Sequence, residues 1–395
     1  MRDATIHLVA AEESGDILGA ALMRAMRAIS PAIRFAGVGG RNMAQEGIIS
    51  AFPIADLSIV GIGAIAGKLP LILRHIRETA AAVVAARPDA LVIIDSPDFT
   101  HRVARRVRAA APDIPIINYA PPTVWAWRPW RARAMRAYVD EALALLPFEP
   151  AAYRRLTGPH CTYVGHPLGE RLTALRPSAL EAQRRIADPP VVLVLPGSRN
   201  SEISRLLAPF GAAVAFAAAA AGPFELVLPT VPHVADRVRR ETASWSVRPR
   251  IVVDPAEKNA AFRVARAALA ASGTVTLELA LAQVPMVAAY RVLSWEGWLF
   301  RLMATIDTAN LANLVLGEKV VPEFFQSDVR AGPLGTALAR LISAPDAQRR
   351  QLEAFSRLDS IMELGATPPS ARAAQAVLAV ANRHSAGLPS ADRSC

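Results

Sequence analysis

The chain has 395 residues, too many for one common domain, and its 52% hydrophobic residues can fill two large cores. Its formal net charge of +10 comes almost entirely from arginine, which suits phosphates or an anionic membrane surface. With two cysteines and no metal-type spacing of cysteine and histidine, the sequence excludes a disulfide framework and a zinc site, and it indicates a reducing compartment.

Neither a signal peptide nor a membrane-spanning helix is expected. Asp3, Glu12 and Glu13 stand near the N-terminus, where a signal peptide would carry an apolar core. No apolar run reaches the ~18 residues that a spanning helix requires. The sequence predicts a cytoplasmic protein whose contact with a membrane is peripheral.

The N-terminal half has the pattern of a doubly wound α/β domain. A short apolar strand is expected at Thr5–Ala11, followed by a polar loop and a helix over Leu18–Ile29, and a second strand is expected at Phe35–Gly40. Gly61–Ala66 matches a dinucleotide fingerprint only loosely, and Gly67-Lys68 lacks the other residues of a P-loop, so we reject both motifs.

An apolar cluster ringed by cations follows. It could lie in a membrane interface or form part of a core helix. Its members are Leu69, Leu71, Ile72 and Leu73, with Lys68, Arg74 and Arg77 around them.

The stretch Ala90–Asp95 predicts a buried parallel strand that ends in a carboxylate, where doubly wound sheets carry their chemistry. Asp95 and Asp98 are close enough for one to act as a base and the other as a positioner. Alternatively, Asp98 caps a helix over Thr100–Ala110. Further strands are expected at Ile114–Tyr119, Ala142–Leu146 and Thr162–Gly165.

Two tryptophans follow the fourth strand. Trp125 and Trp127, beside Arg128 and Arg131, could stack on a sugar, lie at an interface or pack in the core. They fall within the arginine-rich region 102–136, which has eight arginines and one acidic residue. Such a run is more often a solvated helix face than a binding site.

A polar stretch, Arg176–Pro190, indicates a domain boundary. We expect a first domain over 1–168, a linker over 169–190, a second Rossmann-like domain over 191–345, C-terminal helices over 346–383 that pack back, and a disordered tail over 384–395. Strands in the second half are expected at Val191–Leu195, Glu225–Leu228, Arg250–Val253, Ala268–Ala271 and Met286–Ala289. The aromatic segment Trp295–Met303 could be an interfacial element or a dimer contact.

Two strand-end turns of the second half suit a nucleotide. After Val191–Leu195, a glycine turn and a helix start bring N–H groups together, and Arg199 adds a fork of donors suited to diphosphate. An ordinary turn with a surface arginine is the alternative. At Ser272–Glu278 a second such turn precedes Glu278, which could accept both ribose hydroxyls or be a solvated helix residue.

Taken together, these stretches resemble the lipid-A-disaccharide synthase family over nearly the whole chain. Each motif alone is weak, but so many in one order are specific. The matching segments are Glu12–Leu18, Gly37–Met43, Ile94–Phe99, Val124–Arg128, Leu146–Tyr153, Val164–Leu168, Leu195–Ile203, Ser272–Glu278, Pro285–Arg291, Leu311–Leu314 and Pro322–Gln326.

The resemblance implies a fold and a reaction. The fold is α/β, with two facing Rossmann-like domains of the GT-B glycosyltransferase type and a C-terminal helix that crosses back to the first. The reaction is metal-independent, inverting transfer of 2,3-diacylglucosamine from UDP to 2,3-diacylglucosamine 1-phosphate (lipid X), at the inner membrane surface. The resemblance also implies that the protein has no cofactor and no nucleic acid partner, and members of the family are known to dimerise.

The resemblance also assigns roles to residues. Asp95 matches the catalytic base that takes the proton of the acceptor 6-hydroxyl. The residues expected to bind the UDP-sugar are Gly197, Ser198, Arg199, Ser272, Gly273, Thr274, Glu278, Asn313 and Gln326. The residues expected on the acceptor side are Glu12, Ser14, Asp16 and Asp98.

The chain departs from the family pattern at a few positions, most notably at Ala64, where the family has glutamate, which affects the acceptor side more than the UDP site. Two other functions stay open from the residues alone. One is another UDP-sugar enzyme of this fold, such as an epimerase or a transferase with a soluble acceptor. The other is a nucleotide-sugar-binding protein without turnover.

Overall fold

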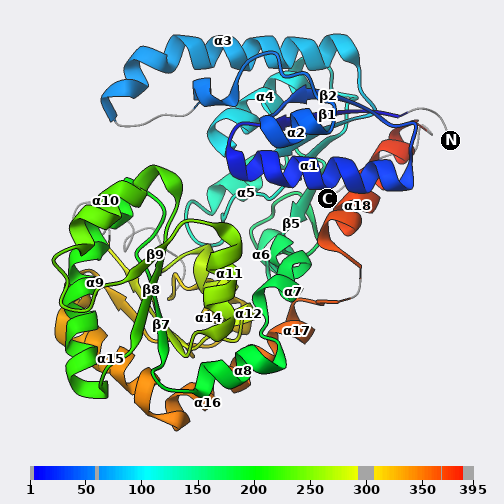
Figure 1. Cartoon of the computed structure of the whole chain (residues 1–395). Helices are drawn as coiled ribbons and strands as arrows, with labels where there is room; N and C mark the ends of the chain where they lie inside the picture. The colour runs from blue at the N-terminus through cyan, green and yellow to red at the C-terminus, as the bar shows by residue number, and fades with distance from the viewer. Residues whose placement is uncertain (1–3, 58–61, 292–306, 366, 386–395) are drawn as a thin grey trace. The chain divides into compact units, whose positions relative to one another are not determined.

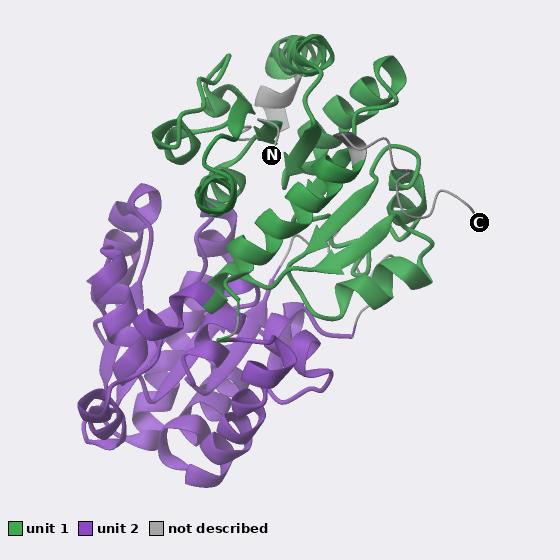
Figure 2. Cartoon of the chain, turned by 90° about the vertical axis from the view of Figure 1, so that its right-hand side faces the viewer, with its two compact units in different colours: residues 1–169, 365–395 green, residues 170–364 purple. Residues whose placement is uncertain are grey.

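The computed structural model describes residues 4–57, 62–291, 307–365 and 367–385. The chain forms two compact units, one of residues 1–169 with 365–395 and one of residues 170–364 (Figure 2). The segment Trp295–Met303 and residues 386–395 of the expected tail lie outside the described residues, whereas residues 384 and 385, also expected in that tail, belong to the last helix.

Unit 1 is built on a parallel six-stranded sheet of order β2-β1-β3-β4-β5-β6. Helices lie on both faces, which explains why its central strands are continuous apolar runs. The strands are β1 Thr5–Ala10, β2 Arg34–Val38, β3 Ala90–Ile94, β4 Ile116–Tyr119, β5 Glu141–Ala144 and β6 His160–Tyr163. The helices are α1 Glu13–Ile29, α2 Arg41–Gln45, α3 Ile62–Ala86, α4 Pro97–Ala110, α5 Trp130–Met135, α6 Glu149–Arg155 and α18 Pro369–Ser385.

Unit 2 carries a second parallel sheet of order β12-β11-β10-β7-β8-β9. Its strands are β7 Val191–Leu195, β8 Glu225–Pro229, β9 Arg250–Val252, β10 Ala267–Ala271, β11 Met286–Tyr290 and β12 Glu323–Phe325. Its helices are α7 Leu172–Leu175, α8 Ala179–Ile186, α9 Asn200–Ala221, α10 Pro232–Thr242, α11 Pro255–Val264, α12 Thr274–Leu281, α14 Leu311–Leu316, α15 Ala331–Ser343, α16 Pro345–Ser356 and α17 Leu358–Ile361. The expected fold class is confirmed.

The C-terminal helices divide between the units. The last helix, α18, packs against α1 and adds Ala373, Ala374 and Val377 to the core of unit 1 (Figure 1). The two helices before it, α16 and α17, belong to unit 2. The segment that returns to unit 1 therefore begins at residue 365, whereas the sequence suggested residue 346.

Helix α9 corrects one expectation from the sequence. Its 22 residues are long and apolar enough to cross a membrane by length and composition. Its inner face, however, belongs to the core of unit 2 through Leu206, Phe210 and Val214, and the helix packs along α15. The apolar composition therefore fits a core helix, with many small residues where two helices lie close together.

The chain reverses its winding once in each sheet, and this places the functional loops. In unit 1 it passes from β1 to β2 on one side and then to β3 on the other. In unit 2 it passes from β7 to β8 and β9, and then to β10 on the other side of β7. Loops that leave such a switch point diverge at the carboxyl edge of the sheet, where doubly wound folds bind their ligands.

Candidate active site

Asp95 lies at the switch point of unit 1, directly after β3. Its Oδ1 accepts the Ser96 N–H at 2.8 Å, and its Oδ2 accepts the Ser14 hydroxyl at 2.7 Å. The side chain is half-buried. Asp95 and Ser96 both have left-handed backbone, with φ of 52° and 44°, which costs a non-glycine residue about 1–3 kcal/mol. Strain of this kind at a strand end is typical of functional sites.

Ser14, in the first turn of α1, fixes the direction of the Asp95 carboxylate. We expect Ser14→Ala to lower kcat about tenfold, because a hydrogen bond to a charged group contributes about 1.5–3 kcal/mol. Ser14→Thr keeps the hydroxyl and is expected to retain most activity. Steady-state rates of the two variants check this; equal losses in both would contradict it.

Glu12 and Asp16, on either side of Ser14 at the start of α1, differ from each other. Glu12 is exposed and its carbonyl oxygen accepts the Asp16 N–H. Asp16 is 2% exposed, and its carboxylate accepts N–H groups of Gly40 at 2.7 Å and Met43 at 3.0 Å. It also accepts hydrogen bonds from the backbone N–H and the side-chain amide of Asn42, both at 2.8 Å. Asp16 therefore shapes this edge of unit 1 by fastening the loop after β2.

Asp98 does not cap a helix as the alternative expectation had it. Helix α4 begins at Pro97, and its N-cap residue is Ser96, without a side-chain capping bond. Asp98 lies inside the first turn, 89% of its side chain is exposed, and Arg131 is 3.7 Å away. A carboxylate in the first turn still favours the helix through its dipole.

Glu149 is a site residue that is not among those expected from the sequence. Its carboxylate is 3% exposed and accepts three N–H groups: Trp125 Nε1 at 2.9 Å, Leu145 at 3.1 Å and Leu146 at 2.9 Å. It thereby ties the loop after β4 to the loop after β5. The signal was present as a glutamate between apolar residues in Leu146–Tyr153, but its side-chain partner, Trp125, lies 24 residues before it in the sequence.

Burial raises the pKa of Glu149 from 4.5 to about 7, although its hydrogen bonds act in the opposite direction. Between these values the folded state holds the proton more tightly than the unfolded state, so stability falls as pH rises. We expect Glu149→Gln to lack this fall, which amounts to up to ~1.4 kcal/mol per pH unit. Urea unfolding of both proteins between pH 4.5 and 8 checks this; a stability difference that does not change with pH would contradict it.

The apolar cluster on α3 is partly buried in the core and partly exposed. Ile72 and Leu73 pack against the core of unit 1, and Leu71 is half-buried. Leu69 is 43% exposed. Part of the cluster is thus core, and the part near Leu69 offers apolar surface next to the cationic residues around it.

The turn after β7 already holds an anion, which comes from the chain itself. Gly197 has a φ of 108°, which favours glycine, and the Glu202 carboxylate accepts the N–H groups of Ser198 at 2.9 Å and Arg199 at 3.2 Å. The Arg199 guanidinium donates to the same carboxylate at 3.1 Å, while 78% of its side chain is exposed. This turn therefore has donors arranged for a negatively charged group. Glu202 is not among the site residues expected from the sequence.

The turn after β10 lies across the switch point from it. Gly273 precedes α12, and no heavy atom lies within 4 Å of where a β-carbon would stand, so the turn is open. Thr274 is exposed at the helix start, and the Ser272 hydroxyl donates to Glu323 at 3.4 Å. An open helix N-terminus at a switch point suits a phosphate.

Glu278 is not the solvated helix residue that the alternative expectation proposed. It is 6% exposed and forms ion pairs with Lys258 at 2.8 Å and with Arg171 at 3.4 Å. Its Oε1 is buried without a hydrogen-bond partner among the described residues. A ribose hydroxyl donating to this oxygen would supply the missing bond.

Asn313 and Gln326, the two remaining residues expected to bind the UDP-sugar, lie in different surroundings. Asn313 is 1% exposed, and its amide bonds the backbone of Val320 and Val321 at 2.9–3.0 Å, so it braces the segment before β12. Gln326 lies directly after β12 with left-handed backbone, φ 46°. Strand β12 itself is not among the strands expected from the sequence, because three residues after Pro322 give too short a pattern.

Glu323 joins these elements and was also missed. Its carboxylate accepts hydrogen bonds from Thr308, from the Ala309 N–H at 3.2 Å and from Ser272. Burial raises its pKa above the usual range, opposed by these bonds. It therefore links the turn after β10 to the segment that leads into α14.

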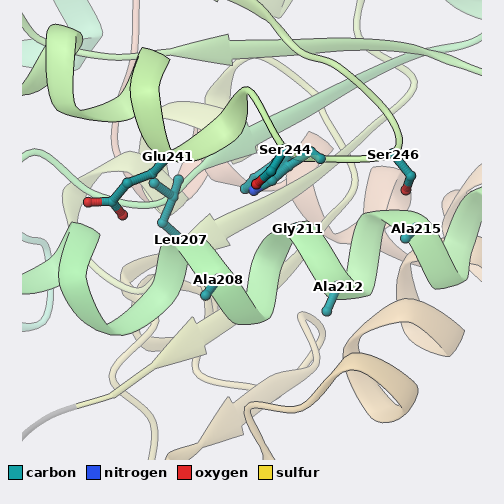
Figure 3. Close-up of a pocket in the computed structure, with 9 residues that line it drawn as sticks. Leu207, Ala208, Gly211, Ala212, Ala215, Glu241, Ser244 and Ser246 are labelled. Carbon is teal, nitrogen blue, oxygen red and sulfur yellow. The ribbon is translucent and has the colours of Figure 1, made fainter.

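A cavity of about 400 Å³ between α9 and the segment after α10 is not part of this site (Figure 3). Trp245 occupies the space that the missing side chain of Gly211 leaves on α9. The residues that line the cavity, among them Leu207 and Glu241, come from α9, from the end of α10 and from the segment after α10, and not from the carboxyl edge of the sheet.

Known proteins match the chain along its length. A family model described as lipid-A-disaccharide synthetase matches residues 6–380. A lipid-A-disaccharide synthase of Rhodopseudomonas palustris (strain HaA2) is 57% identical over 380 residues, covering 96% of this chain and 97% of the relative. One of Rhodospirillum centenum (strain ATCC 51521 / SW) is 43% identical over 383 residues, covering 96% and 95%.

Solved structures share the fold at low identity. The glycotransferase of kitacinnamycin aligns with a TM-score of 0.63 and 18% identity, covering 96% of this chain and 100% of that one. UDP-GlcNAc 2-epimerase from Neisseria meningitidis bound to UDP-GlcNAc aligns with a TM-score of 0.61 and 12% identity, with the same coverage. Since one model spans both units and a relative is 57% identical over 380 residues, the chain belongs to the lipid-A-disaccharide synthetase family.

Proposed function

We propose that this enzyme transfers 2,3-diacylglucosamine from UDP-2,3-diacylglucosamine to lipid X, forming the β(1→6)-linked lipid A disaccharide 1-phosphate and UDP. The observation that carries the proposal is the pair of switch points. At the switch point of unit 1, the Asp95 carboxylate accepts a hydrogen bond from the Ser14 hydroxyl. At the switch point of unit 2, two turns have N–H groups that suit phosphates. The names of the relatives agree with this reaction.

The proposed mechanism is a single displacement with inversion. Asp95 Oδ2, held by Ser14, takes the proton of the acceptor 6-hydroxyl. The oxygen of that hydroxyl attacks C1 of the donor sugar at the same time. The bond from C1 to the diphosphate breaks, and its electron pair leaves with UDP. Arg199 and the N–H groups of Ser198 and Thr274 stabilise the charge on the departing diphosphate.

Glu202 has a defined part in this scheme. Its carboxylate now accepts the donors that the diphosphate would need, so it must release them when the donor binds. A carboxylate in that place also keeps Arg199 folded over the turn before the substrate arrives. The ribose hydroxyls of UDP would donate hydrogen bonds to Glu278, which forms an ion pair with Lys258.

We further propose that the reaction needs no metal and takes place on the cytoplasmic face of the inner membrane. Arginine and helix N-termini supply the positive charge that a divalent ion supplies in other glycosyltransferases. The exposed Leu69 with its cationic neighbours suits a surface from which an acylated substrate is taken.

Purified protein mixed with UDP-2,3-diacylglucosamine and lipid X, in the presence of EDTA, tests the function. Mass spectrometry is expected to detect the disaccharide 1-phosphate and UDP in equal amounts, and neither without lipid X. An isomerised UDP-sugar formed without acceptor would indicate an epimerase and overturn the proposal. Activity that requires added Mg²⁺ would overturn only the metal-independent part.

A further inference from the structure

The loop after β4 presents an arginine stacked on a tryptophan. The Arg128 guanidinium lies 4.0 Å from the ring centroid of Trp127, and 38% of Trp127 is exposed. Among the described residues, no carboxylate forms an ion pair with Arg128. A planar cation on an aromatic ring without an acidic partner is well suited to bind a phosphate with two parallel hydrogen bonds.

The loop is held firmly, so the pair has a fixed position. Trp125, two residues before Trp127, donates to the buried Glu149 and packs edge-on against Phe148, with ring centroids 4.8 Å apart. The Tyr153 hydroxyl donates to the Pro122 carbonyl at 2.8 Å. The loop also turns sharply at both ends, with φ of 55° at Ala120 and 56° at Arg128.

This loop lies beside the one that carries Asp95. Strands β3 and β4 are neighbours, with Ile94 opposite Tyr119, so both loops leave the same edge of the sheet. The Asp95 N–H donates to the Tyr119 carbonyl at 3.2 Å. Further on, Arg131 and Asp98 approach within 3.7 Å, which links the segment after Arg128 to the start of α4.

We propose that Arg128 binds the phosphate monoester of the acceptor and that Trp127 provides the face beside its sugar ring. This rests on the proposed function, in which the acceptor is a sugar phosphate whose hydroxyl must reach Asp95. Glu149 then acts as a positioning residue, since it holds the loop through Trp125. The pair thus distinguishes a phosphorylated acceptor from the same lipid without phosphate.

The experiment compares two acceptors and three variants. The acceptors are lipid X and 2,3-diacylglucosamine lacking the 1-phosphate, both in mixed micelles. The variants are Arg128→Ala, Arg128→Lys and the control Arg133→Ala, which removes an exposed arginine of α5. Acceptor kcat/KM and equilibrium binding without donor, followed by tryptophan fluorescence, are measured for each pair.

For lipid X, Arg128→Ala is expected to lower kcat/KM and binding by about 10- to 100-fold, Arg128→Lys by less, and Arg133→Ala by under threefold. For the acceptor without phosphate, wild type and Arg128→Ala are expected to differ by under threefold. The KM for the UDP-sugar and the midpoint of thermal unfolding are expected to stay unchanged.

An equal loss with both acceptors, or no loss with either, overturns the proposal. The binding measurement separates it from the proposed function. If lipid X binds in a phosphate-dependent way that needs Arg128 but no disaccharide forms, the function fails and this inference stands. If the phosphate makes no difference to binding by the wild type, the inference fails whether or not transfer occurs.

Discussion

Asp95→Asn is expected to lower kcat about a thousandfold while the KM for UDP-2,3-diacylglucosamine stays within threefold of the wild type. A positioned general base contributes about 10²–10⁴ to a rate, and an amide cannot take a proton from a hydroxyl. The asparagine oxygen can still accept a hydrogen bond from Ser14 or Ser96. The variant is therefore expected to keep the strained backbone at the end of β3. Initial rates at saturating acceptor measure the effect.

Asp346→Asn is the matched control, because Asp346 lies on α16, in no turn that the proposed mechanism uses, with a 62% exposed side chain and an ion pair to Arg340 at 3.2 Å. It is expected to keep kcat within threefold. If Asp95→Asn turns over at the wild-type rate, or if both variants lose activity equally, the base is another group. Equal thermal unfolding midpoints of the two variants would exclude misfolding as the cause.

Much of the fold follows from local patterns. Each of the eleven strands expected from apolar runs appears in the sheets, with ends that shift by a few residues. The twelfth, β12, was missed because Phe324-Phe325 is short and follows Pro322. Its place at the sheet edge depends on pairing with β11, which the sequence of the segment does not reveal.

The candidate site was predictable where the chemistry lies at a strand end. Asp95, Arg199 and the turn at Gly273 each follow an apolar run directly, and parallel strands carry ligands at that edge. The long-range partners within the site were not predictable, because they depend on which strands are neighbours. Ser14 meets Asp95 from 81 positions away, and Glu149 meets Trp125 across two loops.

Arg199→Lys is expected to lower kcat/KM for the UDP-sugar about a hundredfold, an effect comparable to losing one preorganised donor at a developing charge. Lysine keeps the charge but has no planar fork, so it can contact one phosphate oxygen where arginine contacts two. It also changes the unbound turn, because Arg199 and the two N–H groups now share the Glu202 carboxylate. Kinetics with varied UDP-sugar, and inhibition by UDP, measure the loss.

Arg239→Lys is the control, since Arg239 pairs with Asp236 on its own helix and lies outside both turns. It is expected to behave as the wild type. The loss in Arg199→Lys should appear in kcat as well as in the inhibition constant of UDP, because the charge on the diphosphate grows as the bond to the sugar breaks. A rise in the inhibition constant of UDP with kcat unchanged would mean that Arg199 binds the ground state and the transition state equally. The charge on the departing diphosphate would then be stabilised by the turn after β10.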